Sequence, residues 1–269
     1  MSTILSIKDL SFGYDKTYLY KDFNLEIEKG DWVSILGANG AGKSTLVKLL
    51  IGILKSENKI EIDHISLNKN SLNEIRKNIA VVFDNPEIQF VAETVKDEIA
   101  FTLENLQYPK EQIHEMVMEV SERLKIKELL DVEPHRLSGG QMQKVALASA
   151  LVLKPKILIL DEALSMIDPY DKDEIMKMLK KYHKDSETTI LNFTSDIEEA
   201  IYSDRIVGLY KGQIGIDGPV KAVLNEERAM KKLGLEVPFI VDLAQRLKLY
   251  GLLDDIELDM DKMVNELWK

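Results

Sequence analysis

The chain has 269 residues, of which 45% are hydrophobic and 30% are charged, with a formal net charge of -11 and no cysteine. This length and composition indicate a globular protein of one large domain, or of one domain with an appendage. The acidic charge argues against nucleic-acid binding, which usually needs a basic face, and the lack of cysteine excludes disulfides and thiolate chemistry.

The first part of the chain reads as strands around a glycine-rich loop. Residues 4–14 alternate apolar and polar side chains, as a half-buried strand does. Residues 23–36 indicate a strand, a turn at 29–31 and a more apolar strand that suits a sheet covered on both faces. Helical apolar spacing follows over residues 44–54. The loop therefore lies between a buried strand and a helix.

The rest of the chain alternates strands with helices, which implies an α/β fold with a largely parallel sheet. After a strand over 188–194, Asp196 can cap a short helix whose first turn carries Glu198 and Glu199, where acids suit the helix dipole. The other expected elements are short strands over 61–83, helices over 86–153, a buried strand over 156–161, a hairpin over 205–218 and acidic helices from 219 onward.

The loop GANGAGKST, residues 37–45, matches the pattern G-x-x-x-x-G-K-[ST] in full. Glycines let successive backbone N–H groups turn toward phosphate oxygens, and the helix N-terminus adds positive potential. Lys43 would reach the β- and γ-phosphates, and Ser44 would offer its hydroxyl to Mg²⁺. A chance glycine turn is the alternative. The strand and helix around the loop favour an ATP site, formed by Gly37, Asn39, Gly40, Ala41, Gly42, Lys43, Ser44 and Thr45.

The stretch ILILDE, residues 157–162, places two acids at the end of a buried strand. Asp161 would hold Mg²⁺ directly or through water. Glu162 would orient or deprotonate the attacking water. Alone, the pair could be a solvated acidic turn, but together with the glycine loop it predicts Mg²⁺-assisted hydrolysis of ATP.

The stretch LSGGQ, residues 137–141, lies just before a helix, so Ser138, Gly139, Gly140 and Gln141 form a second anion-receptive N-terminus. One glycine-loop site does not need a second phosphate cradle, whereas a site shared across a dimer interface does. A simple helix cap is the alternative. The nearby strand ending in Asp161 and Glu162 favours the cradle.

These motifs together resemble the nucleotide-binding subunit of ATP-binding-cassette (ABC) transporters over residues 4–218. The resemblance implies a P-loop NTPase fold: a mostly parallel sheet core, an N-terminal antiparallel β subdomain and a helical signature subdomain at about 86–153. It also implies that Tyr14 stacks on adenine, unless Tyr14 is only a turn aromatic. By the same resemblance, Asp168 couples the two sites of a dimer, and residues 164–167 meet the partner chain.

A closer resemblance is to the ATPase subunits of energy-coupling factor (ECF) vitamin transporters. It is carried by VVFDNPEIQFVAETVKDEIAFTLENL, residues 81–106, and by LGLEVPFIVDLAQRL, residues 233–247. It implies a C-terminal helical dimerisation extension over 219–269, unless that tail is a generic cap. The implied partners are a second ATPase subunit, a transmembrane coupling subunit and a substrate-binding membrane subunit, which place this chain at the cytoplasmic face of the membrane.

No part of the chain is expected to span the membrane itself. No window reaches the about 18 apolar residues of a transmembrane helix, and the first residues lack the basic start and apolar run of a signal peptide. The expected association with the membrane is therefore peripheral, through the partner subunits.

Two positions depart from the family pattern. Asp84 replaces the usual glutamine, and it could bind Mg²⁺ or repel the γ-phosphate. Ser195 replaces the usual histidine, and its simplest interpretation is an ordinary cap at the end of a strand. Because the other motifs are intact, we expect a heterodimer in which this chain's LSGGQ serves the partner's ATP while its own site hydrolyses slowly.

Three other functions remain open at this point. A cobalt or nickel importer tends to use one ATPase type, which should keep the usual glutamine and histidine at both catalytic positions, so Asp84 and Ser195 disfavour this function. A soluble ATPase acting on DNA or ribosomes often carries two cassettes or basic inserts, and this acidic chain has one cassette and no such insert. A subunit that binds ATP without hydrolysing it differs from the main hypothesis only in the residual rate at its own site.

Overall fold

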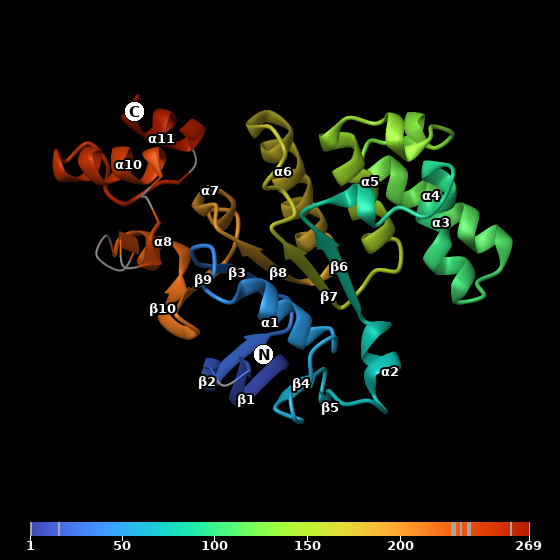
Figure 1. Cartoon of the computed structure of the whole chain (residues 1–269). Coiled ribbons are helices and arrows are strands. Elements are labelled where there is room, and N and C mark those ends of the chain that lie inside the picture. Colours follow the sequence, from blue (N-terminus) through green and yellow to red (C-terminus); the bar gives the residue numbers. More distant parts are fainter. Residues whose placement is uncertain are drawn as a thin grey trace.

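The structure, a computed structural model, describes residues 2–15, 17–226, 230–231, 233–235, 238–258 and 260–268. Its centre is a six-stranded sheet of order β10-β9-β3-β8-β7-β6 (Figure 1). Parallel pairing joins β9, β3, β8, β7 and β6, and only β10 runs antiparallel to its neighbour β9. The strands are β3 (Trp32–Leu36), β6 (Ile79–Phe83), β7 (Ile157–Asp161), β8 (Thr189–Thr194), β9 (Arg205–Tyr210) and β10 (Gln213–Pro219).

The central strands are buried along their whole length. Every residue of β3, β7 and β8 is buried. Their sequences do not alternate between apolar and polar residues, because both faces of a parallel sheet are covered by other elements. Because these strands run parallel, their C-terminal ends lie along the same side of the sheet. The residues that follow β3, β6, β7 and β8 are therefore brought together there.

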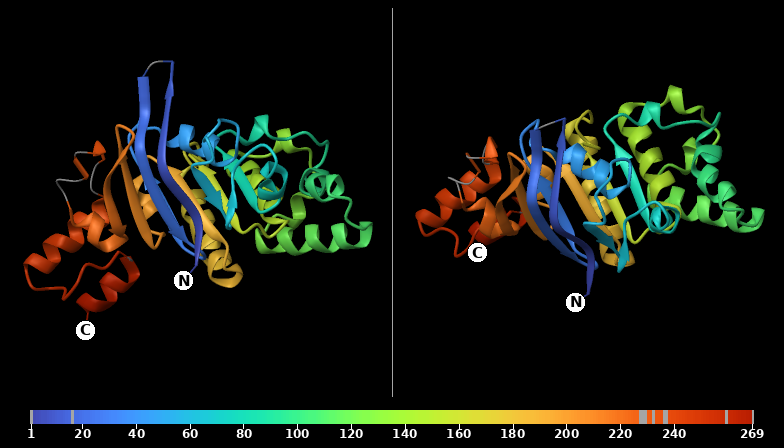
Figure 2. Two further views of the ribbon diagram at one scale, coloured as in Figure 1. Left: turned by 90° about the horizontal axis from the view of Figure 1, so that it is seen from below. Right: turned by 60° about the horizontal axis from the view of Figure 1, so that its bottom comes forward.

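A second, antiparallel sheet of order β2-β1-β4-β5 lies beside the first (Figure 2). The helix α1 (Lys43–Leu50) shares a hydrophobic core with residues of both sheets, including Ile7 and Phe23 of the second and Val33 of the first. The strands of this sheet are β1 (Thr3–Tyr14), β2 (Thr17–Glu28), β4 (Ile60–Ile62) and β5 (Ile65–Ser66).

A helical subdomain covers the β6 edge of the main sheet, where α5 contacts β6. Its helices are α3 (Val95–Asn105), α4 (Lys110–Arg123) and α5 (Gly139–Leu151), with short turns η1 (Pro86–Ile88), η2 (Lys127–Leu129) and η3 (Pro134–Arg136). Two further helices flank the sheet, α2 (Leu72–Arg76) and α6 (Pro169–Ser186). The predicted α/β fold with an antiparallel N-terminal sheet and a helical subdomain is confirmed.

The chain ends in helices at the opposite side of the main sheet from α3–α5 (Figures 1 and 2). They are α8 (Val220–Leu224), α10 (Phe239–Leu249) and α11 (Met260–Leu267), preceded by the short α7 (Ile197–Ala200). Val220, Val223 and Val241 pack with Leu36 and Ile206 of the main sheet. A separate cluster of Ala244, Leu253, Ile256 and Met263 holds the last helices together.

The boundary of this extension at residue 219 stays a prediction. Residues 236 and 237, inside the stretch that carries the closer resemblance, lie outside the described residues. Among the helices that the structure describes, none is long and apolar enough to cross a membrane.

Candidate functional site

The glycine-rich loop leaves β3 and begins α1, as its sequence predicts. A Cβ at Gly37 would lie 2.8 Å from the Leu209 carbonyl oxygen, and one at Gly42 would lie 2.5 Å from Tyr20 Oη. Gly42 also has φ +112, a conformation that favours glycine. Tyr20 Oη donates a hydrogen bond to the Gly42 carbonyl at 2.8 Å, which fixes the loop against β2. The loop shape therefore depends on glycine at both positions.

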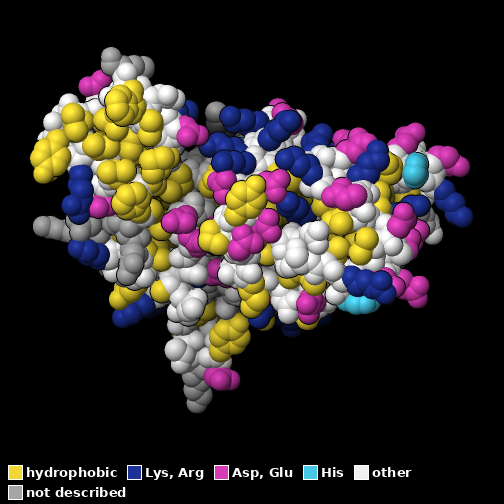
Figure 3. Space-filling view, turned by 90° about the horizontal axis from the view of Figure 1, so that it is seen from above, with side chains coloured by type: hydrophobic (Ala, Val, Ile, Leu, Met, Phe, Trp, Pro, Cys, Tyr) yellow, Lys and Arg dark blue, Asp and Glu magenta, His cyan; other side chains and the backbone are white. Residues whose placement is uncertain are grey.

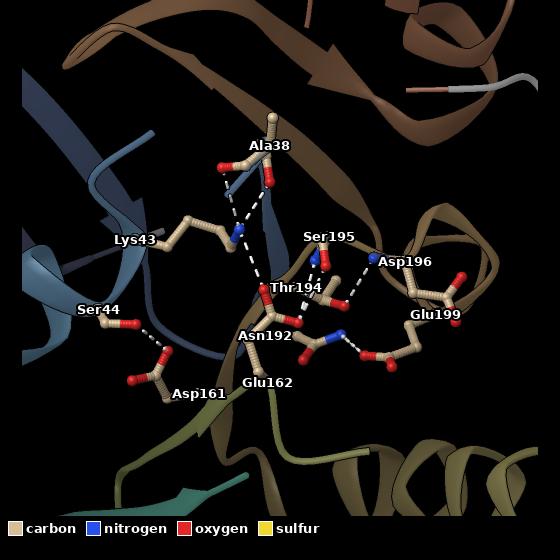
Figure 4. A network of polar contacts seen from close by, with 11 residues as sticks. Ala38, Lys43, Ser44, Asp161, Glu162, Asn192, Thr194, Ser195, Asp196 and Glu199 are labelled. Atoms are coloured by element: carbon tan, nitrogen blue, oxygen red, sulfur yellow. Dashed lines mark hydrogen bonds and ion pairs between the residues drawn. The ribbon is translucent and has the colours of Figure 1, made fainter. Parts of the chain in front are cut away.

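Lys43 is the first residue of α1, and its side chain is buried. Its ammonium group donates to the Gly37 carbonyl at 2.6 Å and lies 3.5 Å from the Ala38 carbonyl oxygen. The same nitrogen forms an ion pair with Glu162 Oε1 at 3.0 Å (Figure 4). The two motifs that the sequence separates by more than a hundred residues thus meet at one cation.

Ser44 and Asp161 form a second link between the motifs. Ser44 Oγ donates to Asp161 Oδ1 at 3.1 Å. Burial raises the pKa of Asp161 above its usual range, and the nearby negative charges of Glu162 and Asp84 add to this effect. A hydroxyl and a buried carboxylate side by side are hard oxygen ligands, which fit Mg²⁺ when phosphates complete its coordination.

Asp84 directly follows β6, whose last residue, Phe83, lies opposite Asp161 in the sheet. Its carboxylate accepts a hydrogen bond from the Asn85 N–H at 2.9 Å. The neighbouring Gln89 turns to the Asn85 carbonyl at 3.5 Å instead. Asp84 therefore adds negative charge at the edge where Asp161 and Glu162 already stand.

Glu162 is held from two sides. Lys43 contacts one carboxylate oxygen, while the N–H and the hydroxyl of Ser195 donate to the other, Oε2, at 3.3 and 3.2 Å (Figure 4). This contact forms because β7 and β8 are parallel neighbours, and the Glu162 N–H donates to the Phe193 carbonyl at 2.8 Å.

The interpretation of Ser195 as a plain helix cap is wrong. The cap of α7 is the Asp196 carboxylate, which accepts from the Glu198 N–H at 2.9 Å, as the sequence predicted for Asp196. Ser195 points the other way, to Glu162. Glu198 and Glu199 lie in the first turn of α7, as predicted, and the side chain of Glu199 is buried.

The LSGGQ stretch begins α5 as a closed capping box. Ser138 Oγ accepts from the Gln141 N–H at 3.3 Å, and Gln141 Oε1 accepts from the Ser138 N–H at 2.9 Å. A Cβ at Gly140 would overlap the Asp171 carboxylate. Among the described residues, no hydrogen bond or ion pair joins residues 138–141 to residues 37–45. The two phosphate-binding motifs of one chain therefore do not form a single site.

Three further predicted positions lie apart from this network. Tyr14 ends β1, is 51% exposed, and its hydroxyl lies 3.2 Å from Thr45 Oγ1 in the P-loop. Asp168 caps α6 by accepting from the N–H groups of residues 170 and 171. Of residues 164–167, Met166 is 75% exposed, but Leu164 is 1% exposed. The expectation that Leu164 meets a partner is therefore wrong for its side chain, which packs in the core.

Sequence reasoning missed several buried polar residues near the site. Gln143 of α5 has no exposed surface, and its amide lies 3.5 Å from the Phe83 carbonyl, next to Asp84. Asn192 of β8 and Glu199 of α7 are also buried and are hydrogen-bonded to each other at 3.1 Å. A glutamine on the apolar face of α5 and an asparagine inside a buried strand were the available signals.

Comparison with known proteins agrees with this geometry. The sequence model of the ABC transporter family matches residues 20–165. The chain is 39% identical to the energy-coupling factor transporter ATP-binding protein EcfA of Pediococcus pentosaceus, over all of this chain and 97% of that protein. It is 37% identical to EcfA1 of Geobacillus kaustophilus, over 98% of this chain and 96% of that protein.

Solved structures show the same fold. The structure of cbiO1 from Clostridium perfringens, part of the ABC transporter complex cbiONQ, matches 91% of this chain and all of that chain with a TM-score of 0.80 and 33% identity. A dimeric ATP-binding cassette in a post-hydrolysis state with ADP and Pi matches 81% of this chain and 99% of that chain, with a TM-score of 0.70 and 26% identity. The chain therefore belongs to the ABC transporter family, as an ABC-type ATPase of the energy-coupling factor group.

Proposed function

We propose that this chain is the ATP-binding and ATP-hydrolysing subunit of an ECF-type importer that energises uptake of vitamins or related micronutrients through membrane partners. We further propose that it forms one half of an asymmetric ATPase heterodimer and that its own site is the weak one. The observation that carries the second part is the contact of Ser195 with Glu162, at the position where the family usually places a histidine.

Binding of ATP uses groups that the structure brings to one edge of the sheet. The backbone N–H groups of residues 37–45 and the start of α1 receive the phosphates, and Tyr14 stacks on adenine. Ser44 and Asp161 hold Mg²⁺, which neutralises phosphate charge when bound. The charge of Asp84 acts on Asp161, so Asp84 could contribute to binding the same cation. Lys43 gives up the Gly37 carbonyl and Glu162 for phosphate oxygens, because one ammonium group cannot serve all of them.

Hydrolysis then depends on Glu162. Once Lys43 has turned to the phosphates, Glu162 Oε1 is free to accept a proton from the attacking water. Glu162 Oε2 remains bonded to the N–H and hydroxyl of Ser195. These two donors hold the Glu162 carboxylate in one orientation beside the phosphate site.

Ser195 also leaves the site without the hydrogen-bond donor that the usual histidine provides. A donor aimed at the charge of a transition state contributes a factor of about 10²–10³ in rate. The Ser195 hydroxyl is committed to Glu162 and its side chain is short, so it does not supply that donor to the γ-phosphate. Asp84 adds a negative charge near Asp161, where the family usually has a neutral glutamine. Both departures slow this site without removing its ATP-binding residues.

The intact LSGGQ supports a role for this chain at the partner's ATP. The capping box orders residues 138–141 before any nucleotide arrives, and it leaves the N–H groups of Gly139 and Gly140 at the helix start. Since these residues do not join the P-loop of the same chain, a second ATPase subunit supplies the P-loop that completes this cradle.

Two exposed apolar surfaces suit the other partners. The first surface lies on the C-terminal helices and is the yellow group at that end of the molecule in Figure 3. It suits pairing with the second ATPase. Its members include Phe239, Leu249, Tyr250, Leu252 and Trp268. The second surface lies within residues 84–101 and includes Ile88, Val91 and Phe101. It suits the transmembrane coupling subunit. A substrate-binding membrane subunit completes the complex. With these partners, the chain would lie at the cytoplasmic face of the membrane.

Hydrolysis by the purified chain and by the complete assembly tests this proposal. We expect the chain alone to turn over ATP about 10²-fold or more slowly than the assembly, because a homodimer would combine two altered sites. Ser195→His in this chain should raise the rate of the assembly, whereas Ser195→Ala should not. Equal rates for the chain alone and the assembly would contradict the asymmetric heterodimer, and an unchanged rate for Ser195→His would contradict the role given to Ser195.

A further inference from the structure

A buried polar cluster lies next to the site, on the side of Ser195 (Figure 4). At its centre is Glu199, which is 1% exposed and accepts a hydrogen bond from Asn192 Nδ2 at 3.1 Å. Lys172 of α6 lies 3.7 Å from the other oxygen of Glu199 and 2.6 Å from Asp196 Oδ2. The side chain of Lys172 is itself 17% exposed. Lys172 is therefore a mostly buried cation shared by two carboxylates of α7.

Lys172 is tied closely to Asp168. The helix α6 begins at Asp168, and the N–H of Lys172 donates to the Asp168 carbonyl at 2.9 Å. Only one helical turn separates the two residues, so Lys172 moves with the start of α6. The exposed Met166 lies just before this helix start, in the segment proposed to meet the partner ATPase.

Asp196 is tied closely to Ser195. One carboxylate oxygen of Asp196 caps α7, the other accepts from Lys172, and the N–H of Asp196 donates to Thr194 Oγ1 at 3.0 Å. With three contacts fixed, Asp196 has little freedom, and the preceding residue Ser195 is held with it. Ser195 in turn directs both of its donors to Glu162.

We propose that Lys172 is a positioning residue that holds the Ser195–Asp196 turn against α6 and so links the partner-facing start of α6 to the carboxylate of Glu162. The chain of contacts is continuous from Asp168 to Glu162. Removing one member of a mostly buried ion pair leaves the other charges unpaired, so the turn should relax away from its place beside Glu162. The consequence for hydrolysis rests on the proposed role of Glu162 as the base; the placement of the turn does not.

Amide hydrogen exchange of the full chain without nucleotide tests the placement. Lys172→Met keeps most of the side-chain stem and removes the charge, and Lys172→Arg keeps the charge. Lys177→Met is the matched control, since it makes the same change on the same helix at a residue 69% exposed and paired with Asp173. We expect Lys172→Met to speed exchange within residues 192–200 about tenfold or more, with both other variants within about twofold of wild type.

Two results would overturn the placement. Unchanged exchange over residues 192–200 in Lys172→Met would show that the turn does not depend on this contact. A uniform increase along the whole chain would show a general loss of stability rather than positioning.

The link to Glu162 is tested in the complete transporter with the base of the partner ATPase substituted, so that the remaining hydrolysis comes from this chain's site. We expect Lys172→Met to lower kcat about tenfold. KM should stay within about twofold of wild type, because Lys172 is remote from the P-loop. Lys172→Arg, which keeps the charge, should keep kcat near wild type. An unchanged kcat would overturn the link. If the unsubstituted site shows no hydrolysis at all, the proposed role of Glu162 fails, and the exchange result still decides whether Lys172 positions the turn.

Discussion

Replacing Glu199 with glutamine should make the stability of this protein less dependent on pH. Burial raises the pKa of Glu199 from 4.5 to about 7, although the hydrogen bond from Asn192 and the charge of Lys172 oppose the shift and the charge of Asp196 adds to it. The folded chain therefore holds the proton of Glu199 more tightly than the unfolded chain does. This contribution to the free energy of unfolding is complete below about pH 4.5 and is lost as pH rises through about 7.

The size of this effect follows from the two pKa values. Between about pH 5.5 and pH 8, the contribution of Glu199 to the free energy of unfolding should fall by about 2 kcal/mol. Glutamine keeps an acceptor for Asn192 and cannot ionise, so Glu199→Gln should gain about 2 kcal/mol relative to wild type across this range. The assay is equilibrium urea unfolding of the full chain at several pH values, with Glu198→Gln, an exposed acid on the same helix, as the matched control.

Two outcomes would refute the reasoning. A difference between Glu199→Gln and wild type that stays constant from about pH 5.5 to pH 8 would mean that Glu199 does not titrate in this range. A wild-type advantage that grows with pH would mean that the carboxylate is stabilised as an anion, so that Lys172 outweighs the cost of burial.

The other predictions concern ATP binding and assembly. Gly37→Ala places a methyl group 2.8 Å from the Leu209 carbonyl oxygen, so the loop must shift. ATP affinity measured by calorimetry should fall about tenfold or more, while the control Ala38→Gly should show no loss. Tyr14→Leu should weaken ATP binding by about 1–3 kcal/mol in the same assay while Tyr14→Phe stays near wild type, because stacking needs the ring; equal losses would refute the stacking role. Tyr250→Ser combined with Trp268→Ser should weaken association with the second ATPase about tenfold or more, measured by sedimentation, since exposed aromatic residues often dominate interfaces. Unchanged association would exclude this surface as the dimer interface.

The sequence predicted the parts of the site that are local in the chain. The P-loop, the acids after β7 and the cap of α5 each lie within one short stretch, where strand, turn and helix signals stand side by side. The parallel sheet was predictable for a similar reason, since β3 and β7 are almost continuous apolar runs. These features need no knowledge of which distant segments become neighbours.

The rest depends on contacts between distant segments. The bond from Ser195 to Glu162 forms only because β7 and β8 pair in one register, which no local pattern reveals. The burial of Glu199 likewise depends on how α7 packs against β3 and β8. In the sequence, Glu198 and Glu199 look alike, and only the packing of α7 exposes the first and buries the second.

Steady-state ATP hydrolysis by the complete transporter tests the central claim most directly, through a comparison of Glu162→Gln in this chain with the equivalent substitution in the partner ATPase. The account predicts that the substitution in the partner removes most of the turnover and leaves only the slow rate of this chain's site. Glu162→Gln in this chain should leave most of the turnover, because the site beside Ser195 contributes little. Loss of turnover with either substitution would show that both sites are needed, and would contradict the asymmetry proposed here.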